Sequence, residues 1–212
     1  MTGTTSKKVP QVQNVKTPRI FAFIDAENIR NSMETYGYKD LDYVKLYDWL
    51  TKTKGVSRIY IYAGIEQGDL VKDKKFKDLQ LLGYIIATKK VVLYAQKPLR
   101  FNITCDNCNK TLTKTITRQS KPKANCDTEL TLDIINGGVR KKYDEAIVFS
   151  GDGDFARVYE YIVNQIKKKV TVYSPMKYPH SIRTSKRIRE LHANNIITLE
   201  DLGTLLLSYG EK

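Results

Sequence analysis

Acidic side chains follow two apolar segments of the chain, a placement that suits metal-dependent hydrolysis. One segment ends at Phe149 and enters a turn that carries Asp152 and Asp154 between glycines. The other ends at Ile24 and is followed at once by Asp25. In parallel α/β sheets the carboxyl ends of the strands meet at one edge, where active sites form. We therefore expect Asp25 and Asp152 to share one acidic site.

The chemistry of such a site depends on the ligands that it offers. Clustered carboxylates repel one another unless a cation neutralises them, so a bound divalent metal is expected. Oxygen ligands, with no His or paired Cys in these segments, favour Mg²⁺ or Mn²⁺ over zinc. Such an ion activates a water molecule and holds the scissile phosphate during hydrolysis. Asn28 and Ser150 lie beside the carboxylates and are expected to position the water or a phosphate oxygen.

Other carboxylates are weaker candidates for the same site. Glu27 lies two residues after Asp25, and Asp127 stands at the start of a predicted helix. Asp133 lies on that same helix but is expected to point only partly in the same direction. Asp127 also has a structural interpretation, as a charge that complements the helix dipole, and Asp154 has one as a helix N-cap. From the residues alone, both interpretations stay open.

The elements that must position these residues alternate between strands and helices. Apolar runs predict the strands, and helical periodicity with Gly at two helix ends predicts the helices. We expect strands at 20–24, 58–65, 84–94, 146–149, 170–173 and 196–199, and helices at 43–54, 69–82, 126–137, 154–168, 181–193 and 202–209. This alternation predicts an α/β fold with a central, mainly parallel sheet between two helical layers. We expect residues 1–18 to form a flexible basic tail and residues 19–212 to form one domain.

A segment at about 96–122 interrupts this alternation. It is polar, rich in Thr and Lys, and too long for an ordinary connection, so we expect an inserted β-hairpin or a mobile loop. Cys105 and Cys108 in this segment have the spacing of half a zinc site, and Cys126 follows in the chain. Zinc held by these three thiols, with water or a distant His as the fourth ligand, is one interpretation. Reduced free thiols and an insertion that becomes ordered only with substrate are the alternatives.

The charge of the chain predicts a polyanionic partner. The sequence has 36 Lys and Arg against 23 Asp and Glu, a formal net charge of +13. Single-stranded RNA is the partner that we expect, gripped through its phosphates by basic side chains of the insertion. These are Lys97, Arg100, Lys110, Arg118, Lys121 and Lys123. A second basic cluster includes Lys186, Arg187 and Arg189.

The composition argues against several other classes of protein. No run of residues approaches the ~18 apolar positions of a membrane span, and residues 1–19 lack the apolar stretch of a secretory signal. The odd count of 3 cysteines argues against a disulfide framework and fits a reducing cytosol. We therefore expect a cytoplasmic protein with no membrane partner, for which a homodimer stays open.

Three segments resemble, in order, the motifs of the NYN domain family, a group of PIN-like ribonucleases that includes the LabA group. Residues 23–29 (FIDAENI) resemble its opening hydrophobic-D-x-x-N motif, and residues 148–155 (VFSGDGDF) resemble its S-G-D-[SG]-D-F motif. Residues 123–133 (KANCDTELTLD) are similar to its middle motif, K-G-x-D-x-x-L-x-x-D. There the sequence departs from the pattern, because Lys123 stands four residues before Asp127 rather than three and the usual glycine is missing.

This resemblance implies a PIN-like three-layer α/β/α sandwich over about residues 19–209. It also implies metal-dependent hydrolysis of RNA phosphodiester bonds, with endonucleolytic cleavage favoured. It places the acidic metal-binding positions at Asp25, Asp127, Asp152 and Asp154, and the polar positions beside them at Asn28 and Ser150.

Two other functions stay open at this point. A non-catalytic RNA-binding or regulatory module could keep the fold and the acidic pocket, although every main acidic position is filled. A phosphatase of the haloacid-dehalogenase type would explain the acidic turn at residues 151–154. That fold requires a second Asp two residues after the nucleophilic Asp25, and the sequence has Glu27 there.

Overall fold

The computed structural model describes residues 17–35, 37–124, 126–174, 184–192, 196–197, 203 and 205–208. The predicted tail at 1–18 lies almost entirely outside these residues, so its flexibility and the domain boundary stay predictions. His180 and Asn125 also lie outside them. In the described ranges, no helix is long and apolar enough to cross a membrane.

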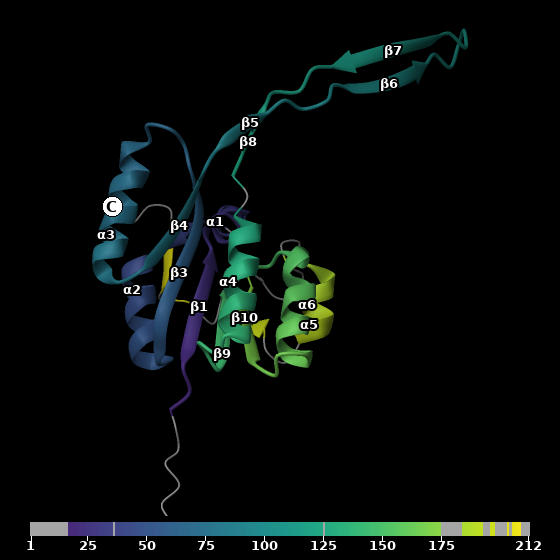
Figure 1. The fold of residues 1–212 in the computed structure, drawn as a ribbon. Coiled ribbons are helices and arrows are strands. Elements are labelled where there is room, and N and C mark those ends of the chain that lie inside the picture. Colours follow the sequence, from purple (N-terminus) through teal and green to yellow (C-terminus); the bar gives the residue numbers. More distant parts are fainter. Residues whose placement is uncertain are drawn as a thin grey trace, which may run out of the picture.

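Parallel strands form the central sheet, as the sequence predicts (Figure 1). In the described part of the chain this sheet has six strands, in the order β11-β10-β9-β1-β3-β4, and every neighbouring pair is parallel. The strands are β1 (Ile20–Asp25), β3 (Val56–Ile65), β4 (Ile85–Lys90), β9 (Glu145–Phe149), β10 (Lys169–Tyr173) and β11 (Ile196–Ile197). From β1 the chain builds outward through β3 and β4, and then returns to build the other half from β9. The reversal of strand order therefore falls between β1 and β9, the point where open α/β sheets bind ligands.

Helices cover both faces of the sheet and complete the three predicted layers (Figure 1). One layer contains α1 (Ala26–Thr35), α2 (Tyr43–Asp48) with the π-helical turn Trp49–Thr53, and α3 (Leu70–Leu82). The opposite layer contains α4 (Asp127–Val139), α5 (Ala156–Asn164) and α6 (Lys186–His192).

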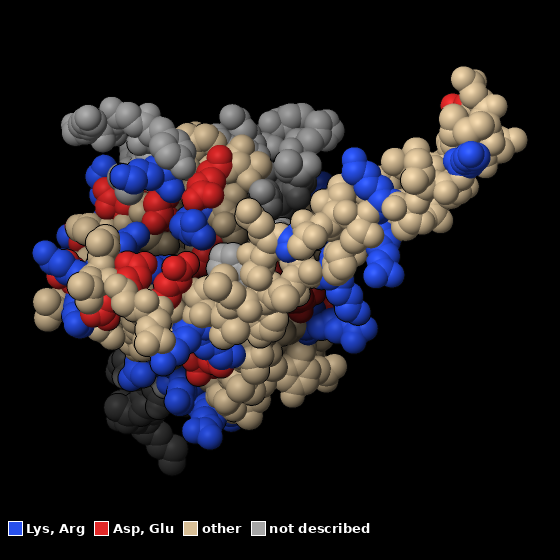
Figure 2. Space-filling view, turned by 90° about the horizontal axis from the view of Figure 1, so that it is seen from above, with Lys and Arg blue, Asp and Glu red and all other residues tan. Residues whose placement is uncertain are grey.

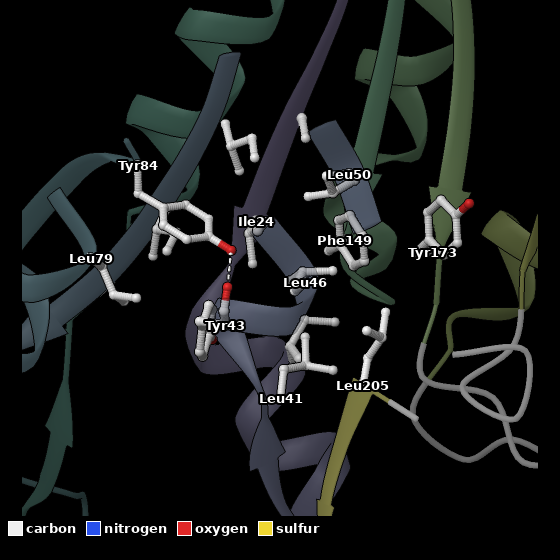
Figure 3. Packing of buried hydrophobic residues seen from close by; sticks show 14 of the residues in the cluster. Ile24, Leu41, Tyr43, Leu46, Leu50, Leu79, Tyr84, Phe149, Tyr173 and Leu205 are labelled. Atoms are coloured by element: carbon white, nitrogen blue, oxygen red, sulfur yellow. Dashed lines mark hydrogen bonds between the residues drawn. The ribbon is translucent and has the colours of Figure 1, made fainter. Parts of the chain in front are cut away.

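Strand β1 is buried on both faces because its side chains alternate between the two cores. Ala22 and Ile24 pack in the core under α1, α2 and α3, and Phe21 and Phe23 pack in the core under α4 and α5. Figure 3 shows the first of these cores, in which the Tyr84 hydroxyl donates a hydrogen bond to a backbone carbonyl of α2 at 2.7 Å. This double burial fixes the end of β1, and hence Asp25, in the middle of the sheet.

Three elements differ from the predictions. Helix α1 and strand β2 (Tyr38–Leu41) occupy a region, between the predicted strand at 20–24 and the predicted helix at 43–54, for which the sequence predicts no helix or strand. The predicted helix at 202–209 is wrong, because residues 206–208 form strand β12 (Leu206–Ser208), which pairs antiparallel with β2. This pairing joins segments far apart in the chain, so local periodicity cannot reveal it.

The predicted inserted hairpin is confirmed as a long two-stranded arm, which we define as residues 92–123. Strands β5 (Val92–Tyr94) and β8 (Lys121–Lys123) pair at its base, and β6 (Leu99–Thr104) and β7 (Thr111–Ile116) pair beyond them. The arm projects away from the body of the domain (Figure 1). Every side chain of β6 and β7 is exposed.

Candidate functional site

The two predicted strand-end segments meet at the reversal point of the sheet. Strands β1 and β9 are neighbours, with Ile24 opposite Phe149, so the residues that follow them lie side by side. Asp25 is the last residue of β1, and Ser150 follows β9 directly. The structure thus brings both segments together at one edge of the sheet, and their shared chemistry stays a prediction.

A hydrogen-bond network joins these two segments. The buried Ser150 hydroxyl donates to Asp25 Oδ2 at 3.2 Å and accepts the amide of Asp152 at 3.2 Å. The other oxygen of Asp25 accepts the amide of Asn28 at 3.1 Å. Asn28 Oδ1 in turn accepts the amide of Gly151 at 2.9 Å. Each polar residue that the motifs single out therefore holds a neighbouring part of the site in place.

Three of the predicted carboxylates converge beside this network. One carboxylate oxygen from each of Asp127, Asp152 and Asp154 lies within 4.8 Å of the other two, and we call these three residues the acidic cluster. Asp127 comes from the first turn of α4 and the other two from the turn after β9. Asp152, rather than Asp154, caps this turn, since its Oδ1 accepts the Asp154 amide at 3.0 Å. The N-cap interpretation of Asp154 is therefore wrong.

The acidic cluster opens into a cavity of about 320 Å³ that Asp25 also lines. The other residues around it are Glu27, Asn28, Asn31, Tyr62, Ala63, Gly64, Ala124 and Cys126. A larger hollow of about 730 Å³ lies between α2 and α3, but its lining is largely apolar and holds no close group of carboxylates. We therefore place the chemistry in the smaller cavity.

The cavity gathers the negative charge of several carboxylates. Burial raises the pKa of Asp25 to about 6, hydrogen bonds from Asn28 and Ser150 act against this shift, and the charges of Asp127 and Asp152 add to it. A divalent cation would relieve this repulsion, and carboxylate oxygens are the ligands that Mg²⁺ and Mn²⁺ prefer. The donor set thus fits such an ion.

Two weaker candidates make other interactions. Glu27 forms ion pairs with Arg30 at 2.7 Å and Lys72 at 3.0 Å. Burial acts to raise the pKa of Glu27, but its two cationic partners outweigh burial and lower it. Asp133 lies on the exposed side of α4 and accepts the Tyr62 hydroxyl at 2.8 Å. Neither carboxylate belongs to the acidic cluster.

The three cysteines are not brought together, so the three-thiol zinc site is wrong as predicted. Cys126 is buried beside the cavity, and its Sγ donates to the carbonyl of Ala63 at 3.5 Å. Cys105 and Cys108 are exposed at the tip of the arm, in the turn that joins β6 and β7. Among the described residues, only the acidic cluster gathers three groups capable of binding a metal. The cause is the arm, which carries two thiols away from the core that holds the third.

The predicted RNA-binding side chains are spread along the arm. Lys97 and Arg118 lie near its base, Arg100 lies in β6, and Lys110 lies at the tip, all of them exposed. Figure 2 shows basic side chains spaced along the projecting arm. The backbone of β8 is described, but the side chains of Lys121 and Lys123 lie outside the described part. Strand β8 leads through Ala124 into the cavity wall, so the arm's base adjoins the site.

The predicted site did not include a basic groove, which lies on the other side of the acidic cluster. It has a volume of about 610 Å³ and shares Asn28, Asn31 and Asp152 with the cavity. Lys186 and Arg189 of α6 line it, and the buried Nε of Arg189 has no hydrogen-bond partner within the described ranges. Both residues belong to the second basic cluster of the sequence, and that cluster was the signal that could have indicated the groove. For Asn31, the signal was its position one turn after Asn28, once α1 is recognised as a helix.

Comparisons with known proteins agree with this architecture. The family described as NYN domain matches residues 19–192. The low amplitude and bright protein LabA from Synechococcus elongatus is 26% identical over 159 residues, which are 74% of this chain and 73% of that protein. A crystal structure of a protein of unknown function from Vibrio parahaemolyticus has a TM-score of 0.65 and 25% identity, and covers 92% of this chain and 100% of its own.

Proposed function

This chain belongs to the NYN domain family, and we propose that it is a metal-dependent ribonuclease that hydrolyses RNA phosphodiester bonds at the acidic cluster. The observation that carries the proposal is the approach of three carboxylate oxygens within 4.8 Å, at the reversal point of a parallel sheet. Carboxylates brought this close need a cation, and the rest of the chain has the positive charge that a polyanionic substrate requires.

Asp127, Asp152 and Asp154 would hold Mg²⁺ or Mn²⁺, with Asp25 at the back of the same cavity. When bound, such an ion supplies positive charge at the scissile phosphate and lowers the pKa of the attacking water. The residues of the chain supply alignment. Ser150 connects Asp25 to the turn that carries Asp152, so neither carboxylate can shift alone. Asn28 holds the same turn through Gly151, and Asn31 extends the polar wall toward the groove.

A basic groove lies on one side of the acidic cluster and the base of the Lys- and Arg-bearing arm lies on the other, which supports a long substrate. Lys186 and Arg189 line the groove on one side, and the base of the arm adjoins the cavity on the other. A single strand held on both sides would be cut within its length, so endonucleolytic cleavage is the form that we propose. Phosphate contacts of this kind are independent of sequence and depend strongly on salt. The free cysteines agree with a reducing, cytoplasmic setting for this activity.

A non-catalytic RNA-binding or regulatory module is the second candidate, favoured only by the basic groove and arm. The phosphatase alternative loses support because Glu27, at the position where that fold needs its second Asp, is held by Arg30 and Lys72.

The test is a cleavage assay on single-stranded and structured RNA, with Mn²⁺ or with chelator, for the wild type and a matched pair of variants. Asp127→Asn and Asp133→Asn make the same change on the same helix, once inside the acidic cluster and once outside it. We expect Asp127→Asn to slow cleavage by at least about 100-fold, as loss of an electrostatic group at a reacting centre does, and Asp133→Asn to cleave like the wild type.

Each other outcome has a defined meaning. RNA binding without metal-dependent cleavage by the wild type would replace the nuclease with the regulatory module. Hydrolysis of p-nitrophenyl phosphate without RNA cleavage would instead favour the phosphatase. Equal loss in both variants would contradict the assignment of the acidic cluster.

A further inference from the structure

The arm is amphipathic, although nothing in the described chain covers it. Antiparallel pairing places Leu99 opposite Ile116 and Ile103 opposite Leu112. Because paired residues share a face and side chains alternate along a strand, one face of the arm is apolar and the other is polar. The largely apolar face carries Leu99, Phe101, Ile103, Leu112 and Ile116, between 39% and 73% exposed, with Lys114 opposite Phe101 as its one charged residue. The polar face consists of Arg100, Asn102, Thr104, Thr111, Thr113 and Thr115.

Such an element has the pattern of a half-buried sheet without the partner that would bury it. A two-stranded hairpin is marginal in water on its own and gains stability when its apolar face is packed. In Figure 1 the arm extends beyond the body, so the body does not provide that cover. No part of the described chain therefore covers this face, and another molecule is a source of the missing surface.

The tip of the arm indicates what kind of molecule would cover its apolar face. Cys105 and Cys108 are exposed free thiols on one tight turn. The Cys105 amide donates to the Lys110 carbonyl at 2.9 Å, and its carbonyl accepts the Asn109 amide at 2.9 Å. Asn109 has φ +51°, which lets the chain curl back at this point. The turn thus presents two exposed sulfurs, three residues apart in the sequence, at the end of the arm.

Two sulfurs are half of a closed zinc site, which takes four ligands in a tetrahedron. The third thiol of the chain, Cys126, is buried in the body, and the described residues hold no group of three metal-binding side chains that includes Cys105 or Cys108. A partner must supply two further thiolates and an apolar strand surface beside them. A second copy of this chain supplies both from the same arm.

We propose that two copies of this protein join through their arms, with one zinc ion held by Cys105 and Cys108 of each copy. The contact is isologous, so a twofold axis passes through the zinc and the same apolar face of each arm packs against its partner. Binding releases the four thiol protons to solvent and leaves a ZnS₄ group of charge −2. Lys110 beside each turn offsets that charge. The zinc ligands are not part of the acidic cluster, so this dimer does not depend on the nuclease proposal.

The experiment measures zinc content by atomic emission and mass by light scattering, on full-length protein purified without chelator. We expect about 0.5 zinc ions per chain and the mass of a dimer. Cys105→Ser with Cys108→Ser should bring zinc to about zero and shift the protein to monomer. Cys126→Ala is the matched control, and it should keep both the zinc and the dimer.

A second variant tests the apolar face separately. Leu112→Asp places a charge on that face and leaves the thiols intact, so the dimer should dissociate at a protein concentration at which the wild type is intact. The thermal unfolding of the body should not change in either arm variant, which shows that the domain still folds. A monomer with one zinc per chain, a zinc-free protein, or a dimer joined by a disulfide would each overturn the proposal.

Discussion

Replacing Ser150 by alanine tests whether the acidic site is pre-aligned by the fold. The side chain is fully buried between the ends of β1 and β9. Its hydroxyl donates to Asp25 and accepts the Asp152 amide, both at 3.2 Å. Alanine removes both bonds while keeping the backbone and nearly all of the volume. The change therefore isolates the link between the two carboxylate-bearing segments.

The expected cost follows from these two bonds. Removing a buried donor to a carboxylate and leaving an amide without its acceptor costs about 1–3 kcal/mol in the free energy of unfolding. Without the Ser150 hydroxyl, the pKa of Asp25 should rise above its value of about 6, because that hydrogen bond favours the charged form. A carboxyl that holds its proton more tightly binds a cation more weakly, so Mn²⁺ affinity at neutral pH should fall as well.

The assay is urea unfolding in chelator, followed by calorimetric Mn²⁺ titration of the folded protein. Ser57→Ala is the matched control, since its exposed hydroxyl donates to the Ile20 carbonyl at the opposite end of β1. That variant should change the free energy of unfolding by no more than about 0.5 kcal/mol and leave Mn²⁺ binding unchanged. In a double-mutant cycle, Ser150→Ala should cost less once Asp25→Asn is present, because the shared bond is already altered. If Ser150→Ala unfolds at the wild-type urea concentration and binds Mn²⁺ with the wild-type Kd, the account of the site as pre-aligned is wrong.

Two further predictions concern the groove and the far end of the sheet. Arg189→Ala should weaken RNA binding and reduce the slope of log affinity against log salt by about one, while Mn²⁺ binding stays unchanged. If the slope measured by fluorescence anisotropy does not change, Arg189 does not contact the RNA. Asp144, paired with Lys168 at 2.8 Å and Arg19 at 3.3 Å, has a pKa held below its usual value by Lys168 first and then by Arg19. Because the folded-state pKa is lowered, this carboxylate contributes stability above its unfolded pKa of about 3.9, and the contribution is lost as the pH falls through the folded value. Asp144→Asn should therefore lower stability at pH 7 by no more than about 1 kcal/mol, since the Asp144 side chain is 35% exposed, and the difference should shrink in acid. A difference that grows on acidification would contradict the sign.

The core of the site could be predicted from the sequence because it depends on local patterns. Apolar runs that end in Asp25 and Ser150 identify two strands, and the parallel α/β rule places their ends together. Asp127 was assigned to the site only through the resemblance to the NYN motifs, since its residue type and position at a helix start also suit a charge that complements the helix dipole. The distinction between Asp152 and Asp154 could not be predicted, because the choice of cap depends on the conformation of a six-residue turn rather than on residue type.

The missed features depend on contacts between distant segments. Helix α1 was not predicted because most of its residues are polar, and its two large apolar residues, Ile29 and Met33, lie only one turn apart. Strand β12 follows a leucine-rich stretch that suits a helix, and only its pairing with β2 makes it a strand. The spacing of Cys126 from Cys108 suggests a shared metal, but the spacing does not show that α4 draws Cys126 into the core. The length of the arm separates Cys105 and Cys108 from Cys126. The sequence indicates that a segment is inserted here, but it does not show in which direction that segment projects.

The central claim is that the acidic cluster hydrolyses RNA with the help of a divalent ion. The most direct measurement is single-turnover cleavage of a labelled single-stranded RNA by the wild type and Asp152→Asn, with RNA binding recorded in the same samples. We predict cleavage by the wild type only when Mn²⁺ or Mg²⁺ is present, and at least about 100-fold slower cleavage by the variant with RNA binding retained. Equal cleavage rates for the two proteins, or wild-type cleavage that persists in chelator, would contradict the claim.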